Sequence, residues 1–105
     1  MPTIPIGFVR EPEVDEAILR VQQALGPDVV RIRYSYDNDW SGEPSLFFRI
    51  LLSDAASRPS NLKEIAQRVT LRLMNEVRTD DYGIHAYFNF RSESEQAALR
   101  DPAWA

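Results

Sequence analysis

At 105 residues, the chain has the length of one ordinary domain and can bury a core without disulfides or metals. Hydrophobic residues make up 44% of it and charged residues 27%, without low-complexity runs or repeats, which excludes disorder and repeat architectures as leading interpretations. The formal net charge of −4 opposes non-specific attraction to nucleic acid and to anionic lipid. We therefore expect a single globular domain over residues 1–105.

The chain contains no cysteine, which excludes a disulfide framework, a thiol nucleophile and a thiolate metal site. Its first residues lack the basic region and long apolar run of a leader sequence, and no stretch approaches the roughly 20 apolar residues that span a bilayer. We expect a cytoplasmic protein with no membrane partner.

Residues 3–9 are extended in character, but Pro5 has no N–H to give to a central strand, so residues 1–10 are expected to form an edge strand or an ordered arm. From Pro12 to Leu25 apolar residues recur at the helical period, acidic residues fall in the first turn, and Gly26-Pro27 follows as a stop. The sequence predicts a first helix there.

Two stretches alternate with the period of two that is typical of half-buried strands, residues 30–36 and residues 46–53. The turn-rich residues 37–45 join them, so we expect an antiparallel hairpin. A third stretch of this kind, residues 84–91, comes late in the chain.

Between the hairpin and the last strand, the sequence predicts an amphipathic helix over residues 60–78, with an apolar stripe that begins at Leu62. Asn61 and Glu64 have the spacing of a capping box, and Ser60 is the rival cap.

A short helix is expected after the last strand, over residues 92–100. Ser92 and Glu95 again have the spacing of a capping box, Asp101-Pro102 ends the helix, and Trp104 follows. Residues 92–105 should therefore form a helical tail.

The predicted order is α-β-β-α-β with a short C-terminal helix, and the predicted fold is a two-layer α/β sandwich of the α+β class. If residues 3–9 form a strand, the order becomes β-α-β-β-α-β, that of a ferredoxin-like domain. The α-β-β-α-β order also resembles that of bacterial type II KH-like RNA-binding domains, although the G-x-x-G loop of that family does not occur in this sequence.

The outer face of the predicted sheet, opposite the helices, collects an unusual set of residues for an acidic protein. It joins four arginines, the only histidine and two aromatic rings: Arg31, Arg33, Phe47, Arg49, Leu51, His85, Tyr87, Asn89 and Arg91. Guanidinium groups bind phosphate or carboxylate bidentately and aromatic rings offer stacking surfaces, so this face is the candidate binding platform. The ordinary explanation, which we rank first, is that an outer sheet face is normally polar and that the tail helix covers it.

The loop of residues 37–43 (DNDWSGE) matches the first, third, fifth and sixth places of a calcium loop. The twelfth place is Phe48 instead of a bidentate Glu, so we interpret the stretch as a hairpin loop. Trp40 at its tip is expected to fold back over the core; exposed, it would be a contact anchor.

No catalytic constellation is recognisable. His85 has no second His, no Cys and no acid fixed beside it by local spacing, and the chain has no Gly-rich phosphate loop, G-x-S-x-G elbow or H-E-x-x-H motif. We expect neither an enzyme, nor a metal site, nor a cofactor.

Two functions fit these observations. The first hypothesis is a small non-enzymatic protein-interaction or adaptor domain that self-associates, as a homodimer or larger homo-oligomer, through the outer sheet face. The alternative is an RNA or single-stranded nucleic-acid binding module that uses the same face. In both, the candidate contact residues are the outer-face arginines and rings, with His85, Asn89 and Trp40.

Overall fold

The structure is a computed structural model that describes residues 11–105, except for the side chains of Asp80 and Tyr82. The arm or edge strand expected in residues 1–10 lies outside the described residues. The elements are α1 (Glu11–Leu25), β1 (Val29–Asn38), β2 (Pro44–Leu52), α2 (Pro59–Val77), the 3-10 turn η1 (Thr79–Tyr82), β3 (His85–Ser92), α3 (Glu93–Leu99) and the 3-10 turn η2 (Pro102–Trp104). This order confirms the predicted α-β-β-α-β arrangement with a helical tail.

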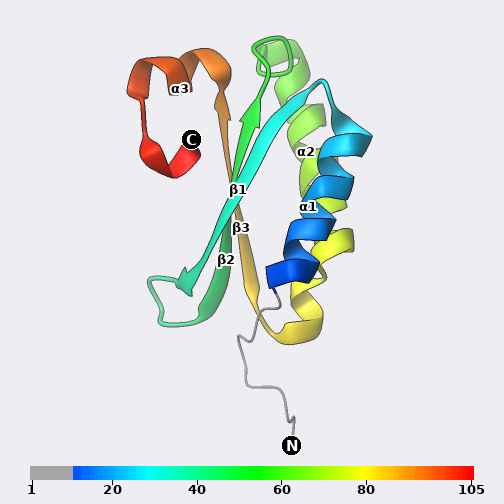
Figure 1. Cartoon of the computed structure of the whole chain (residues 1–105), viewed down its shortest axis with the longest axis vertical. Coiled ribbons are helices and arrows are strands. Elements are labelled where there is room, and N and C mark those ends of the chain that lie inside the picture. Colours follow the sequence, from blue (N-terminus) through cyan, green and yellow to red (C-terminus); the bar gives the residue numbers. More distant parts are fainter. Residues whose placement is uncertain (1–10) are drawn as a thin grey trace, which may run out of the picture.

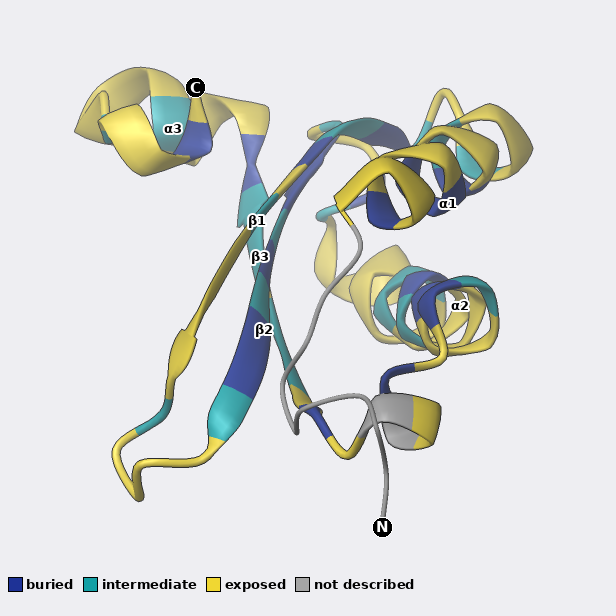
Figure 2. Ribbon diagram, turned by 60° about the horizontal axis from the view of Figure 1, so that its bottom comes forward, coloured by how far each residue is buried: buried dark blue, intermediate teal, exposed yellow. Residues whose placement is uncertain are grey.

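The molecule is a two-layer α/β sandwich, as the sequence predicts. Helices α1 and α2 lie side by side on one face of a three-stranded sheet, and the tail formed by α3 and η2 lies on the other side of it (Figure 1). Figure 2 shows the burial that results, with buried segments of β2 turned toward buried stripes on α1 and α2. The two-helix layer therefore leaves the opposite, outer face of the sheet for the tail.

The sheet has the order β1-β2-β3 and is mixed. β1 and β2 form the expected antiparallel hairpin, whereas β2 and β3 run parallel because α2 carries the chain back along the sheet between them. The ferredoxin-like alternative would need an extra strand in the sheet interior, but β2 is hydrogen-bonded directly to both of its described neighbours. Among the described strands there is no interior gap for another.

The core is built by the alternation of β2 and by the apolar stripes of the two helices. The inward residues of β2 are at most 1% exposed, and they meet the most deeply buried residues of the helices: Leu46, Phe48, Ile50 and Leu52 of β2, Ala17 and Val21 of α1, and Val69 and Leu73 of α2. A register shift between Val29 and Arg31 places Val29 in the core, whereas Val30 is only partly buried.

The start of α2 differs from the capping prediction. The N-cap is Arg58, which makes no side-chain cap bond, and Pro59 occupies the first turn, so neither Asn61 nor Ser60 caps the helix. The Asn61 amide instead donates to the backbone oxygen of Ala55. Leu62, at this end of the stripe, is 38% exposed, so the buried stripe begins further along the helix than we expected.

The start of α3 matches the prediction. The Ser92 hydroxyl accepts from the Glu95 N–H at 3.1 Å, and the Glu95 carboxylate accepts from the Ser92 N–H at 3.1 Å. In the part of the chain that the structure describes, no helix combines the length and apolar character needed to cross a membrane.

Candidate interaction surface on the outer sheet face

Strand pairing brings the predicted outer-face residues together on one surface. Phe47 lies opposite Tyr87 in the parallel pair β2–β3, and Arg49 lies opposite Asn89 in the same pair and opposite Arg33 in the antiparallel pair. The face has two ends of different chemistry. One end is rich in arginine and is covered by the tail; the other is aromatic and lies beside the β1–β2 loop.

At the arginine end, three guanidinium groups hold the backbone of the tail. Arg31 donates to the Trp104 oxygen at 3.0 Å, Arg33 to the Ala105 oxygen at 2.8 Å, and Arg49 to the Ala103 oxygen at 2.7 Å. Arg33 and Arg49 face each other across the two strands, a like-charge pair whose repulsion is offset by the carbonyl oxygens that accept from them.

The fourth arginine of the face holds the side chains of the tail. The Arg91 guanidinium carbon lies 4.3 Å from the centre of the Trp104 ring, and its NH1 donates to the Gln96 side chain at 2.9 Å. Trp104 is only 7% exposed. The tail therefore covers this end of the sheet, which agrees with the ordinary explanation given for the arginines.

Local contacts carry the chain back across the sheet. The Asp54 carboxylate accepts from the Ser94 hydroxyl at 2.6 Å and from the Ser94 N–H at 3.0 Å, which fixes the start of α3 and lowers the pKa of Asp54. Arg100 then ends α3 in the left-handed backbone region with φ of 54°, which reverses the chain toward η2.

The opposite end of the face carries a cluster of rings that we call the aromatic cluster: Trp40, Phe47, His85 and Tyr87. Tyr87 is its centre, stacked on Phe47 at 5.2 Å between ring centroids and tilted against Trp40 at 5.2 Å. His85 flanks it at 6.4 Å. Offset and tilted pairs of this kind are favourable geometries for aromatic rings.

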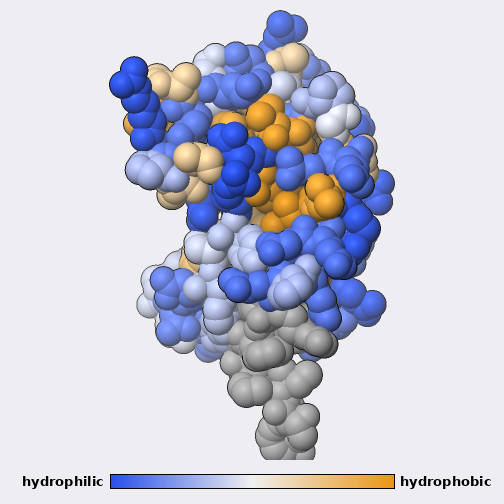
Figure 3. All heavy atoms as spheres, in the orientation of Figure 1, coloured by the Kyte–Doolittle hydropathy of each residue, from blue (hydrophilic) through white to orange (hydrophobic). Residues whose placement is uncertain are grey.

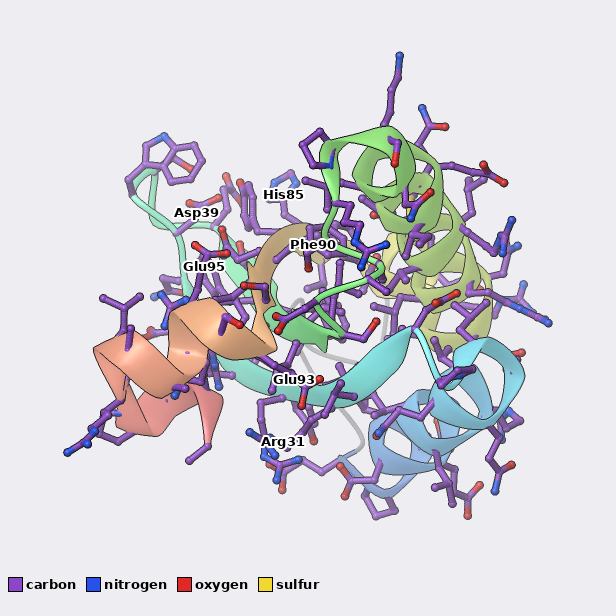
Figure 4. The ribbon with its side chains drawn as sticks, turned by 90° about the horizontal axis from the view of Figure 1, so that it is seen from above. Arg31, Asp39, His85, Phe90, Glu93 and Glu95 are labelled. Carbon is purple, nitrogen blue, oxygen red and sulfur yellow. The ribbon has the colours of Figure 1, made fainter. Side chains whose placement is uncertain are left out.

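Asp39 fixes this cluster to the β1–β2 loop. Its Oδ1 accepts from the Ser41 N–H at 2.9 Å, the Ser41 hydroxyl at 2.6 Å and the Glu43 N–H at 3.0 Å. Its Oδ2 accepts from the Tyr87 hydroxyl at 2.8 Å and from the Ser45 hydroxyl at 3.4 Å. In Figure 4, Asp39 lies on the side of the sheet away from α1 and α2, the side that also carries the tail.

These contacts perturb the acidity of both partners. The hydrogen bond from the Ser41 hydroxyl, followed by those from Tyr87 and from backbone N–H groups, holds the pKa of Asp39 well below its usual range. The hydrogen bond to Asp39 in turn raises the pKa of Tyr87. Asp39 is thus an ionised acceptor whose carboxylate organises the loop.

Trp40 does not fold back over the core as expected. It is 83% exposed, and its only ring contact among the described residues is with Tyr87. The reason lies in the loop, because Asp39 uses both carboxylate oxygens to close the turn and the tip then projects beyond the sheet.

Between the tail and the aromatic cluster, the outer face is hollowed into a shallow groove of about 480 Å³. Its walls come from all three strands and from the tail: Ser35, Phe47, Arg49, Asn89, Phe90, Arg91 and Trp104. Asn89 is exposed beside it. The groove therefore gives the aromatic end a concave border that combines polar and aromatic side chains.

A second hollow, of about 400 Å³, lies near η1, where α1, β2 and the end of α2 meet. It is lined by acids, two arginines and apolar residues: Glu13, Val14, Glu16, Arg20, Leu46, Glu76, Val77, Arg78, Thr79, Asp81 and Ile84. Arg20 pairs with Glu76 and Arg78 pairs with Asp81, each at 2.8 Å. Nowhere in residues 11–105 as described do three potential ligand side chains gather to hold a metal ion.

Sequence reasoning missed two parts of this surface. It treated Asp39 as a loop residue, although the Asp-x-Ser spacing that produced the bonds to Ser41 was visible. It also predicted no contact for Trp104, because this ring reaches Arg91 only through the chain reversal at Arg100.

Comparison with known proteins adds a likeness of fold. No protein-family model matches the chain, and no curated protein matches it in sequence. Among solved structures, the chain is similar to the zinc form of a variant of the MamM CTD, with a TM-score of 0.50 and 13% sequence identity over 79% of this chain and 86% of that one. At this level of identity the likeness shows a shared fold and nothing of function.

Proposed function

We propose that the protein is a small, non-enzymatic protein-interaction domain that contacts other proteins, including further copies of itself, through the aromatic cluster. The observation that carries the proposal is the position of Trp40. It is 83% exposed, yet it sits on a loop closed by five hydrogen-bond donors to Asp39 and rests against Tyr87. A ring on a loop that is already closed has less conformational entropy to lose on binding, and tryptophan and tyrosine are enriched among residues that dominate binding energy.

The chemistry around Trp40 favours a protein over a nucleic acid. Asp37, Asp39 and Glu43 surround the exposed ring in sequence and would repel phosphate groups. The arginines that could attract phosphate already donate to the tail oxygens of Ala103, Trp104 and Ala105. The nucleic-acid alternative therefore lacks a specific supporting observation.

The remaining parts of the proposal follow from the sequence. The cysteine-free chain suits a reducing compartment, so we place the domain in the cytoplasm. The sequence contains no recognisable set of catalytic residues and no partner for His85 of the kind found in catalytic triads. We therefore propose that the aromatic cluster binds a partner and does not catalyse a reaction.

Light scattering after size exclusion tests the proposal over a range of protein concentrations. We expect the wild type to associate as concentration rises and Trp40→Ala to reduce that association. The control Leu71→Ala, which removes an apolar side chain that is also exposed on α2, should leave it unchanged. Association should persist at high salt and should not increase with a random-sequence single-stranded oligonucleotide. Equal association of wild type and Trp40→Ala would contradict the proposal.

A further inference from the structure

The free edge of the sheet offers a second contact surface, distinct from the aromatic cluster. Among the described residues, β1 pairs only with β2, so its other edge is open. Figure 1 shows β1 in front of the other strands, with α1 beside it. An open strand edge presents backbone N–H and C=O groups that can pair with another strand.

Hydrogen bonds show which residues of β1 face that edge. The Val30 oxygen accepts from the Gln22 side chain at 3.3 Å and the Ile32 oxygen from the Arg33 side chain at 3.4 Å, so these carbonyls point away from β2. Alternate residues of an antiparallel strand face alternate sides, so the backbone groups of Tyr34 and Tyr36 also face outward. Within the described chain, neither residue has a backbone hydrogen-bond partner on that side.

An apolar groove runs beside the open segment, between β1 and α1. Its volume is about 320 Å³, and its apolar walls are Ile18, Leu19, Ile32 and the Tyr34 ring. Figure 3 shows apolar side chains gathered on this face of the molecule, the face that Figure 1 presents with β1 in front. Leu19 in the groove wall is 56% exposed, and Tyr36, two residues along β1 from Tyr34, is 45% exposed, so both have apolar surface to bury.

We propose that β1 pairs with β1 of a second copy, antiparallel and across a two-fold axis at Ser35. In this register Tyr34 lies opposite Tyr36 of the partner subunit, and about four main-chain hydrogen bonds join the two strands. Each Tyr36 then reaches the groove beside Tyr34 of the other copy. Two cross-strand aromatic pairs result, of a kind that stabilises antiparallel sheets.

Charge favours this register over the one centred on Arg33. On the outer face, Arg33 lies opposite Asp37 of the partner subunit, and the symmetry repeats the pair. A register centred on Arg33 would place two like charges opposite each other. Registers nearer the β-bulge would also need the outward groups of Val30 and Ile32, which side chains already cover.

The pairing has a consequence for the rest of the surface. A two-fold axis perpendicular to the sheet joins two three-stranded halves into one continuous sheet with both outer faces on the same side. Two aromatic clusters would then be presented together. The dimer itself uses none of the ring contacts of Trp40. A dimer that persists in Trp40→Ala would therefore support this pairing and contradict self-association through the aromatic cluster.

Cross-linking tests the register directly. Ser35 would lie opposite Ser35 of the partner subunit in a non-hydrogen-bonded pair, where Cα atoms are about 4.5 Å apart, within the range of a disulfide. Since the chain has no cysteine, Ser35→Cys should form a covalent dimer rapidly under mild oxidation, at least tenfold faster than the control Ser60→Cys, whose serine is also exposed. Cross-linking of both variants at the same rate would overturn the proposal.

The Ser35 hydroxyl accepts from Arg49, and Ser35→Cys changes this bond. An exchange of charges gives a second test that does not depend on Ser35. Arg33→Asp and Asp37→Arg should each weaken the dimer about tenfold, measured by sedimentation equilibrium, because each places like charges opposite each other twice. The double variant should recover most of the wild-type affinity, although Arg33→Asp alone also loses the bond to Ala105. The proposed pairing would be overturned if the double variant dimerised no more tightly than the single variants. It would also be overturned if the wild type stayed monomeric at every concentration.

Discussion

The Tyr87 hydroxyl donates to the Asp39 carboxylate at 2.8 Å across 48 residues of sequence. This bond joins the loop residue that follows β1 to β3, although β1 and β3 are not neighbouring strands. It explains how an exposed Trp40 can still have a defined position, because its neighbour in sequence is fixed to the same tyrosine against which its ring rests.

Removal of this bond should loosen the loop while the fold stays intact. Tyr87→Phe keeps the ring that stacks on Phe47 and loses only the hydroxyl. We expect faster amide hydrogen exchange at Ser41 and Glu43 and an unchanged far-ultraviolet circular dichroism spectrum. Tyr36→Phe is the control, since no hydrogen bond of the Tyr36 hydroxyl occurs among the described residues. Equal loop protection in the two variants would mean that the bond does not hold the loop.

The lowered pKa of Asp39 predicts a pH-dependent contribution to stability. A carboxyl with a depressed folded-state pKa stabilises the fold above its ordinary pKa, about 3.9, and this contribution is lost as the pH falls from there toward the folded-state pKa. Asp39→Asn should therefore melt at a lower temperature than the wild type at pH 7, with a gap that narrows below about pH 4. A gap that stayed constant from pH 7 to pH 3 would show that the charge of Asp39 is not responsible.

Two neighbouring positions in α2 test the packing of the core. Val69 is fully buried, whereas Arg68 is exposed and pairs with Glu64 one turn earlier. Val69→Asp should unfold the domain, since an unpaired buried charge costs several kcal/mol against a total stability of roughly 5–15 kcal/mol. Arg68→Asp should change the stability by about 1 kcal/mol or less. Thermal melts followed by circular dichroism test this. If both variants lost the same amount of melting temperature, the assignment of Val69 to the buried side of α2 would be wrong.

Trp104 should hold the tail and not the core. Replacement of a buried tryptophan by alanine costs about 3–5 kcal/mol of stability. The few hydrogen bonds from arginines to the tail do not compensate for a loss of this size. In Trp104→Ala we expect residues 93–105 to lose amide protection while α1, α2 and the sheet keep theirs. Leu99→Ala, at an exposed position of α3, should leave the tail in place. Loss of protection throughout the molecule would assign Trp104 to the main core instead.

Short-range patterns were predicted well from the sequence. The capping box of Ser92 and Glu95 involves neighbouring residues, so its spacing sufficed. The corresponding prediction for Asn61 was wrong because Pro59, already suited to a first helical turn, starts α2 earlier and leaves Arg58 as the cap. Where two start signals compete within one turn, spacing alone does not choose between them.

Long-range relationships were only partly accessible. The period of two placed Arg31, Arg33 and Arg49 on one face, but their partners are backbone oxygens, which have no sequence signal. The tail reaches these arginines through Arg100, whose backbone is left-handed. Glycine is usual at such a position, so an arginine there does not indicate the chain reversal in the sequence. The exposure of Trp40 likewise depends on how Asp39 closes its loop, and not on the tryptophan itself.

The central claim is that the aromatic cluster is the working surface, and a dilution series followed by heteronuclear NMR tests it most directly. With backbone amides and the Trp40 indole observed from low to high protein concentration, we expect the signals of Trp40, His85 and Tyr87 to shift together with increasing association. The amide signal of Leu71 on α2, which is also exposed to solvent, should not shift. If the chain associates while the signals of the aromatic cluster stay fixed, or if those signals are unchanged across the whole series, the claim is wrong.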